Sequence, residues 1–428
     1  MDILINVVAV AFLLSLTAYA VTLGLGNWRI ARVNARTADI ERELLRKRID
    51  QITEQQGVDR EKGELSWNGF RQFEIIRKQP EGGGICSFYL SPHDKKPLPP
   101  FDPGQYLTFQ LPIPGQRKPV IRCYSLSDSP NHPDYYRVSI KAVPPPRDNP
   151  DNVPPGLSSN YFHDSVDEGT ILDCKAPGGH FFLDMSQHAP VVLIGGGIGL
   201  TPVLSMLNAI CESGSTREVW FFYGVRNRSE HVMKDHLERI AAEHENVHLQ
   251  VCYSSPGEHD VEGRDYQHAE RVSVELFKRV LPSSNFDYYM CGPPPMMDTV
   301  VSDLAAWGVP GKNVHFEAFG PATVKKTAPE KNPEEKAADA AAAEGIEVVF
   351  AKSGKTCQWD PEADSLLDFA EENDVAIDFG CRAGNCGTCI TAIRSGEVKY
   401  VVEPGAAPES GSCLICISVP KSSLTLDA

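Results

Sequence analysis

The sequence predicts a multidomain chain with four structured parts. These are an N-terminal transmembrane helix, an antiparallel β-barrel, an α/β domain on a parallel sheet, and a small α+β domain at the C-terminal end. Three observations support this. Residues 3–25 contain no charged side chain, residues 65–185 form short β-rich runs broken by Pro and Gly, and apolar strands alternate with helical segments from residue 191 onward. A chain of 428 residues is also too long for one core.

The charge balance excludes one class of partner. The net charge is −16, whereas nucleic-acid binding needs a basic footprint. From residue 346 onward there are 13 acidic and 6 basic side chains, a balance of −7. This acidity favours a docking surface for a basic partner protein or simply keeps the region soluble, and the sequence leaves both open. The twelve cysteines show no regular disulfide framework, which indicates a reducing compartment.

The uncharged run at residues 3–25 predicts a membrane anchor within residues 1–28. Its 23 residues would extend about 34 Å as a helix, enough for a bilayer core. The competing interpretation is a signal peptide, since Ala18-Tyr19-Ala20 imitates a cleavage site, but Met1-Asp2 lacks the expected basic charge. Three arginines follow Trp28 and place the rest of the chain in the cytoplasm: Arg29, Arg32 and Arg36. We therefore expect a single-pass protein of the inner, cytoplasmic membrane with its catalytic domains facing the cytoplasm.

Residues 29–62 predict a helical stalk, because apolar side chains recur at helical spacing among Arg and Glu. Residues 63–186 predict the β-barrel. Four runs there have the composition of strands: 73–77, 86–90, 106–111 and 136–141. Residues 187–321 predict the α/β domain. A buried strand from Val191 runs into a glycine-rich turn and then an apolar helix, which is typical of a pyrophosphate-binding turn.

Several short motifs lie in these two domains. The barrel region holds Arg122-Cys123-Tyr124-Ser125, Gly104-Gln105-Tyr106 and Gly156-Leu157-Ser158-Ser159. The α/β region holds the turn from Gly195 to Pro202, two arginines at positions 226 and 228, and Cys291-Gly292-Pro293-Pro294. Taken singly, each also fits an ordinary strand, turn or core cysteine. In this order and spacing they resemble the motifs of the ferredoxin-NADP reductase superfamily. The wider sequence from Trp67 to Asp184 is similar to the reductase module of flavohaemoglobins, which implies FAD rather than FMN.

The resemblance implies roles for individual residues. Arg122 would hold a phosphate by paired hydrogen bonds, Tyr124 would stack on the isoalloxazine, and Ser125 would reach flavin N5. Cys291 would contact the nicotinamide, and Phe319 would be the ring that the nicotinamide displaces. The expected catalytic residues are Ser125, Cys291 and Phe319. The expected cofactor-binding residues are Tyr106, Arg122, Cys123, Tyr124, Ser125, Lys141, Gly156, Ser158, Ser159, Gly195, Gly196, Gly197, Gly199, Thr201, Pro202, Arg226, Cys291, Gly292, Phe319 and Gly320.

Two finer expectations concern phosphates. Ser159 is expected to donate to the flavin diphosphate. Arg226 and Arg228 could receive the 2′-phosphate of NADPH, and no acidic residue beside them in the sequence suits the 2′-hydroxyl of NADH. Because Arg226 also occurs in relatives that use NADH, we favour NADH and leave NADPH open.

The C-terminal region, residues 345–428, follows an Ala-, Pro-, Lys- and Glu-rich linker at residues 322–344. It contains Cys381, Cys386 and Cys389 at C-x4-C-x2-C spacing and a distant Cys413-x-x-Cys416. This is the plant-type pattern for a [2Fe-2S] cluster, and the region resembles plant-type ferredoxins, which implies a β-grasp fold. A zinc site or a disulfide pair is the alternative. If Cys413 and Cys416 lie on one strand they face opposite ways, so only one can be a ligand. The ferredoxin pattern favours Cys381, Cys386, Cys389 and Cys416.

Together these features predict an NAD(P)H-dependent oxidoreductase with FAD and a [2Fe-2S] cluster. We expect it to pass single electrons to a partner oxygenase, hydroxylase or desaturase that is itself membrane-associated. One alternative is a respiratory subunit that reduces quinone, similar in parts to the NADH-oxidising subunit of the sodium-pumping quinone reductase, although the domain order differs. Another is a redox sensor or assembly subunit.

Overall fold

The computed structural model describes residues 2–428 except 117–118, 146–153, 320–344, 362, 378, 380–383, 385–386, 402–403 and 405–407. In the first helix, the side chains of residues 2–9 and of several positions between 26 and 59 are likewise not described. The predicted linker therefore lies outside the described residues, as do Gly320, Cys381 and Cys386. The chain divides into two compact units, Met1–Glu61 and Lys62–Ala428.

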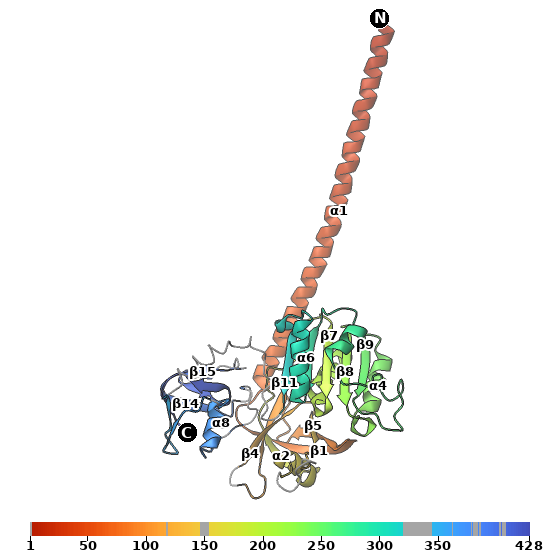
Figure 1. Ribbon diagram of the computed structural model, residues 1–428. Coiled ribbons are helices and arrows are strands. Elements are labelled where there is room, and N and C mark those ends of the chain that lie inside the picture. Colours follow the sequence, from red (N-terminus) through yellow and green to blue (C-terminus); the bar gives the residue numbers. More distant parts are fainter. Residues whose placement is uncertain are drawn as a thin grey trace. The chain divides into compact units, whose positions relative to one another are not determined.

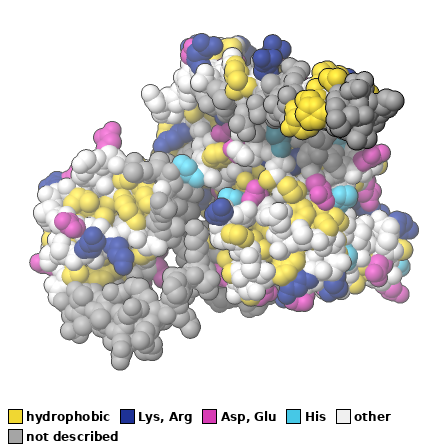
Figure 2. Space-filling model, turned by 90° about the horizontal axis from the view of Figure 1, so that it is seen from above, with side chains coloured by type: hydrophobic (Ala, Val, Ile, Leu, Met, Phe, Trp, Pro, Cys, Tyr) yellow, Lys and Arg dark blue, Asp and Glu magenta, His cyan; other side chains and the backbone are white. Residues whose placement is uncertain are grey.

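The first unit belongs to one continuous helix, α1 (Asp2–Leu65), so the predicted anchor and stalk form a single element (Figure 1). Large hydrophobic side chains of α1 are exposed at ten positions between Val10 and Trp28. On the face of the whole molecule that Figure 2 draws, hydrophobic side chains lie among charged ones of both signs. The predicted transmembrane helix at residues 3–25 is not supported: among the described residues, no helix has the length and apolarity to cross a membrane. The described side chains of that run begin only at Val10.

The second unit begins with an antiparallel sheet, as predicted, in the order β4-β3-β6-β1-β2-β5. Its strands are β1 (Arg71–Gly82), β2 (Ile85–Pro92), β3 (Tyr106–Leu111), β4 (Val120–Ser125), β5 (Tyr136–Lys141) and β6 (Ile171–Cys174). A bridge between Leu126 and Val138 joins the two outer strands and closes the barrel. Helix α2 (Leu157–Ser165) packs Phe162 into the barrel core, and the sequence analysis did not anticipate it.

The next domain contains the predicted parallel sheet, in the order β11-β10-β7-β8-β9. Its strands are β7 (Val191–Gly196), β8 (Val219–Val225), β9 (Val247–Tyr253), β10 (Asp287–Gly292) and β11 (Val314–Ala318). Its helices are α3 (Leu200–Glu212), α4 (Lys234–Glu243), α5 (Val274–Val280) and α6 (Pro294–Ala306). Both faces of the sheet are buried (Figure 1), because alternate residues of β7 enter separate cores with α3 and α4 on one side and α5 and α6 on the other. This explains why β7 is a continuous apolar run.

The C-terminal domain has a mixed sheet in the order β13-β12-β18-β14-β16, with a separate β15-β17 pair. The strands are β12 (Glu347–Phe350), β13 (Lys355–Gln358), β14 (Ile390–Ser395), β15 (Val398–Tyr400), β16 (Ser412–Leu414), β17 (Ser418–Pro420) and β18 (Leu424–Leu426). Helix α8 (Leu366–Glu372) follows Ser365, whose hydroxyl caps it by accepting from the Asp368 N–H. Its apolar face packs Leu366 and Phe369 into the domain core. A helix packed on a mixed sheet, as the described residues show, is the α+β arrangement that the sequence predicted.

Candidate functional site

Three polar side chains meet where the barrel contacts the parallel sheet. Ser125 ends β4 and is buried. Cys291 lies in β10 beside Glu317 of β11, in parallel register. The Ser125 hydroxyl donates to Glu317 Oε2 over 3.4 Å, a contact between residues 192 positions apart in the chain. The predicted catalytic residues Ser125 and Cys291 therefore both neighbour Glu317, a residue that the sequence analysis did not identify.

Burial raises the pKa values of the two groups that the parallel sheet contributes, the Glu317 carboxyl and the Cys291 thiol. Glu317 keeps some solvent exposure, yet the protein around its carboxyl raises its pKa to about 8, and the Ser125 hydrogen bond opposes this only in part. Burial also raises the pKa of the Cys291 thiol well above its usual value, and the neighbouring Glu317 adds to the effect. Near neutral pH the site therefore holds a protonated carboxyl and a neutral thiol, so it presents little charge to a cofactor ring.

The glycine-rich turn is pressed against this site. A Cβ on Gly199 would lie 2.2 Å from the carbonyl oxygen of Cys291, and one on Gly196 would lie 2.8 Å from the Pro293 ring. Gly197 has a φ of 55°, which favours glycine. The turn continues as a 3₁₀ turn, Gly197–Gly199, into α3, where the Thr201 hydroxyl donates to the carbonyl of Ile198 over 3.1 Å. Only glycine therefore fits at position 199, and the turn lies directly beside the Cys291-Gly292 segment.

The predicted phosphate-binding residues of the barrel lie on β4 and at the start of α2. Arg122 lies on β4 and donates to the carbonyl of Ile121 over 2.7 Å. Ser158 is buried, and its hydroxyl has no hydrogen-bond partner among the described atoms. The Ser159 hydroxyl instead donates to the carbonyl of Gly156 over 3.3 Å. An unpartnered buried hydroxyl is costly, so Ser158 fits a phosphate ligand better than Ser159, which the sequence analysis favoured.

The remaining predicted flavin residues lie on the barrel strands. Tyr106 begins β3, Cys123 and Tyr124 lie on β4, and Lys141 ends β5. Tyr124 packs edge-on against Phe162, with ring centroids 5.1 Å apart, and burial raises its pKa. Phe319 follows β11 and packs, partly buried, against the core of the α/β domain. The roles assigned to these residues stay predictions.

The C-terminal edge of the parallel sheet contains a carboxylate that the sequence did not reveal. Arg226 and Arg228 are exposed after β8. Asp260, more than thirty residues further along, accepts from the Gly257 N–H over 2.8 Å and from the Arg228 N–H over 3.4 Å. An acidic group therefore lies beside Arg228 in the fold although it is distant in the sequence, because the loop after β9 returns to the end of β8.

Two of the four predicted cluster ligands lie within the described residues. The sulfurs of Cys389 and Cys416 are 3.0 Å apart, both residues are buried, and neither forms a disulfide. Two thiolates on one tetrahedral metal ion, with bonds of about 2.3 Å, would lie about 3.8 Å apart. The observed separation of the Cys389 and Cys416 sulfurs is within about 1 Å of this value, so both could bind the same metal ion. Gly384 has a φ of 75°, and a Cβ there would lie 2.3 Å from Ile417. The donor set and the tight loop fit a metal cluster.

Cys413 and Cys416 do not share a strand, so the predicted difference in their facing does not arise from strand alternation. Only Cys413 is on a strand, β16, whereas Cys416 lies in a 3₁₀ turn, Ile415–Ile417. Both side chains are buried. What distinguishes them is their neighbour: Cys416 lies beside Cys389, while Cys413 pairs across the sheet with Thr391. Burial raises the pKa of Cys413 to about 12, which suits a packed thiol.

Three family models match successive parts of this chain. They are "Oxidoreductase FAD-binding domain" over residues 85–183, "Oxidoreductase NAD-binding domain" over 193–302 and "2Fe-2S iron-sulfur cluster binding domain" over 348–421. Each covers most strands of one of the three sheets. Among solved structures, this chain resembles the flavohem-like FAD/NAD-binding domain of nitric oxide dioxygenase from Vibrio cholerae O1 biovar El Tor. The two sequences are 33% identical, and the TM-score of the two structures is 0.51. The match covers 59% of this chain and 99% of that one.

The chain belongs to the flavohaemoglobin-like FAD/NAD-binding reductases.

It carries a 2Fe-2S domain in addition, so the cofactors of this reductase are FAD, NAD(P)H and a 2Fe-2S cluster. The flavohemoprotein of Bacillus thuringiensis subsp. konkukian is 40% identical over 259 residues, which are 60% of this chain. The reductase spans 63% of the length of that curated relative. Phthalate dioxygenase reductase, described as a modular structure for electron transfer from pyridine nucleotides to [2Fe-2S], is 27% identical with a TM-score of 0.50. That match covers 84% of this reductase and 98% of the other chain.

Proposed function

We propose that this reductase takes electrons from NAD(P)H and delivers them singly, through its 2Fe-2S domain, to a partner oxygenase, hydroxylase or desaturase. The observation that carries the proposal is the extent of the two kinds of match. Similarity to the flavohemoproteins covers 60% of the chain, whereas similarity to phthalate dioxygenase reductase covers 84% and nearly all of that protein. The family model for the 2Fe-2S domain matches the C-terminal part.

The residues of the site suit this chemistry. Bound FAD would supply the conversion between the two-electron chemistry of nicotinamide and the one-electron chemistry of the cluster. Ser158 offers a buried hydroxyl for a phosphate, and Gly199 brings the nucleotide turn against Cys291. The Ser125 hydroxyl and the Glu317 carboxyl form a polar pair at the contact between barrel and sheet. A protonated Glu317 keeps this contact uncharged, so two planar rings could stack there without facing a fixed charge.

The test is an anaerobic titration of the full-length protein with NADH, followed by visible absorbance and low-temperature EPR. The proposal expects loss of the flavin band together with the signal of a reduced [2Fe-2S] cluster. Loss of the flavin band without that signal would leave a flavin reductase with an unconnected metal domain. Steady-state reduction of a water-soluble quinone should be slow, and fast turnover would favour the quinone-reducing alternative.

Nucleotide choice is part of the same proposal. We favour NADH, because the Asp260 carboxylate lies at the sheet edge where the nucleotide ribose is expected to bind and is suited to accept from a 2′-hydroxyl. Asp260→Asn should then raise the KM for NADH several-fold and leave that for NADPH nearly unchanged. If NADPH is the substrate instead, Arg228→Ala should raise the KM for NADPH far more than that for NADH. Equal effects on both nucleotides would contradict each assignment.

Membrane attachment is a proposal from the apolar sequence at residues 3–25 and the exposed hydrophobic side chains of α1. We place the protein at the cytoplasmic membrane with its cofactor domains in the cytoplasm, next to a membrane-associated partner. In cell fractionation the full chain should remain in the membrane after carbonate washing, and a chain that begins at Lys62 should not. Recovery of the full chain in the wash would reject the attachment.

A further inference from the structure

Asp128 lies three residues after Ser125, at the contact between the barrel and the α/β domain, and is only 8% exposed. Its carboxylate is held from its own domain by Arg137, at 3.3 Å, and by the Tyr135 hydroxyl, at 3.2 Å. Breaking a buried pair of this kind is strongly unfavourable. Asp128 is therefore fixed relative to β4 and to the Ser125 hydroxyl.

Helix α3 of the α/β domain holds the same residue from the other side. The Asn208 amide donates to Asp128 Oδ1 over 3.0 Å, and the Ser205 hydroxyl donates to the Asp128 carbonyl over 2.7 Å. Both α3 residues are buried, with 2% and 0% exposure. Side chain and main chain of Asp128 are thus both bonded to α3.

A chain of hydrogen bonds fixes the orientation of the Asn208 amide. Arg239 donates to His236 Nδ1 over 3.0 Å, so His236 Nε2 carries the proton and donates to Asn208 Oδ1 over 2.8 Å. Burial and the nearby Arg137 and Arg239 lower the pKa of His236, which keeps its imidazole neutral and able to accept. The Asn208 nitrogen is therefore the atom that faces Asp128.

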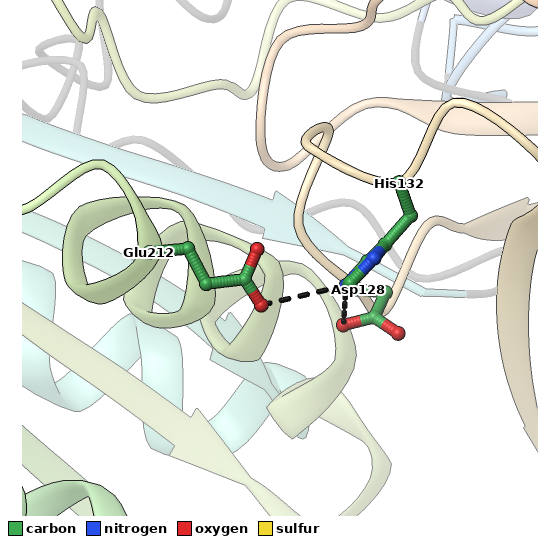
Figure 3. A group of neighbouring side chains, drawn as sticks. All are labelled: Asp128, His132 and Glu212. Atoms are coloured by element: carbon green, nitrogen blue, oxygen red, sulfur yellow. Dashed lines mark ion pairs between the residues drawn. The ribbon is translucent and has the colours of Figure 1, made fainter.

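Figure 3 shows a second contact between the barrel and the α/β domain. His132 of the loop after β4 lies with Nε2 3.4 Å from Glu212 Oε1 at the end of α3, and 3.8 Å from Asp128 Oδ1. Its ring stacks on Tyr135, with centroids 5.0 Å apart. The Asp128 carboxylate already accepts from four donors: Ser129 N–H, Asn208, Tyr135 and Arg137. We therefore interpret Asp128, His132 and Glu212 as a contact between the barrel and the α/β domain.

Helix α3 also carries the glycine-rich turn at its start. Because Gly199 has no space for a Cβ beside the Cys291 carbonyl, a shift of α3 along its axis would drive the turn into β10 or away from it. The position of α3 thus sets the position of the turn relative to Ser125.

We propose that Asp128 is a positioning residue: acting through Asn208 and Ser205, it fixes α3 and the nucleotide turn relative to the flavin strand β4. The inference rests on the proposed transfer from nicotinamide to flavin, whose rate depends steeply on the placement of the reacting atoms. Asp128 itself contacts no cofactor in this role. It acts only through the contact between the two domains.

The test is Asn208→Asp in the full-length holoenzyme. This substitution preserves the volume of the side chain and the acceptor for His236, but places a carboxylate against Asp128 in place of the amide donor. In anaerobic stopped-flow experiments at pH 8 and saturating NADH, flavin reduction should slow by about tenfold or more. The long-wavelength charge-transfer absorbance of nicotinamide stacked on flavin should weaken in parallel.

The pH dependence identifies the contact responsible. Two carboxyls about 3 Å apart share a proton when the pH falls, which restores a hydrogen bond between them. The defect should therefore be largely relieved at pH 6, whereas general loosening of the fold would not improve on acidification. The charged or titratable groups around the pair, from every element packed against it, are Arg137, Tyr135, His132, Glu212, His236 and Arg239.

Asn246→Asp is the matched control. Asn246 makes the same kind of amide bonds, but to the carbonyls of Ser215 and Arg217 within the α/β domain. This variant should reduce its flavin at the wild-type rate at both pH values. A wild-type rate for Asn208→Asp, or equal losses for both variants, would overturn the inference.

Hydrogen exchange provides a readout that does not depend on NADH. Asn208→Asp should speed amide exchange in residues 126–135 and 200–212 at pH 8, and Asn246→Asp should not. Unchanged exchange in those segments would also overturn the positioning role. If wild-type flavin is reduced but the cluster is not, the proposed function fails while the positioning role can still hold, so the two failures are distinct.

Discussion

Glu317 combines a buried carboxyl with a hydroxyl partner, and this determines the sign of its effect on stability. Its pKa is about 8 in the folded protein, against an ordinary value of 4.5. Between these values the folded protein binds a proton that the unfolded chain has released. Stability contributed through this group is therefore complete below pH 4.5 and is lost as the pH rises toward about 8.

Glu317→Gln should remove this loss, because an amide cannot ionise. Relative to the wild type, the variant should gain stability as the pH is raised from 5 to about 8, and the gain should level off by pH 9. The measurement is the difference in Tm between the two proteins at each pH, with the same substitution at the exposed Glu347 as the control. A difference that is constant across this range would contradict the raised pKa.

Individual residues differ in how far the sequence predicts them. Arg122 and Ser125 belong to one short motif, so their proximity is fixed locally. Glu317 reaches Ser125 across 192 positions, and Asp128 meets Asn208 across 80. No local pattern marks such pairs, since their importance arises only when the two sheets pack together. Asp260 was missed for the same reason, because a loop returns it to the edge of β8.

At the scale of elements, the start of α3 is constrained by contact rather than by backbone conformation. Gly199 has an ordinary φ of −61°, which alanine adopts easily. The constraint is the Cys291 carbonyl in β10, 2.2 Å from the position of a Cβ. The sequence revealed a glycine-rich turn, but not which glycine contacts which strand.

Gly199→Ala should therefore push the turn away from Cys291 and slow flavin reduction by NADH at least about tenfold. Gly311→Ala is the control, because a Cβ there meets nothing within 4 Å. Stopped-flow absorbance at saturating NADH compares the two variants. Equal rates would show that the turn can shift without consequence.

Cys416 lies in a short 3₁₀ turn and Cys413 on the strand before it, so the two cysteines are expected to respond differently to substitution. Cys416→Ser should abolish the EPR signal of the reduced cluster, because it removes a thiolate beside Cys389. Cys413→Ser should retain the signal and lose only stability, since that thiol packs in the core. Iron analysis and EPR of both variants decide between them. The reverse result would reassign the fourth ligand.

At the scale of the whole molecule, the sequence predicted three sheets of different type, and three family models match them in the same order. Sheet type follows from the composition and the alternation of side chains along each strand, so the sequence alone is enough to predict it. The first helix was harder to predict from the sequence. Its apolar sequence suggested a membrane span, yet no helix among the described residues meets that requirement.

The acidic side chains of residues 346–428 allow a test of whether this domain docks a basic partner protein. If the surface steers a basic partner, electron delivery to cytochrome c should slow as ionic strength rises from about 10 to 200 mM. Reduction of an uncharged small acceptor by the same protein should change little. Equal salt dependence for both acceptors would mean that the acidity serves solubility alone.

The closeness of Cys389 and Cys416 has a consequence for how the protein is assembled. Two buried thiols 3.0 Å apart need to approach by only about 1 Å to form a covalent bond of about 2.05 Å. Oxidation before iron arrives would thus have a short route to a crosslink that blocks the metal. We therefore expect the domain to take up iron and sulfide only while Cys389 and Cys416 are both reduced.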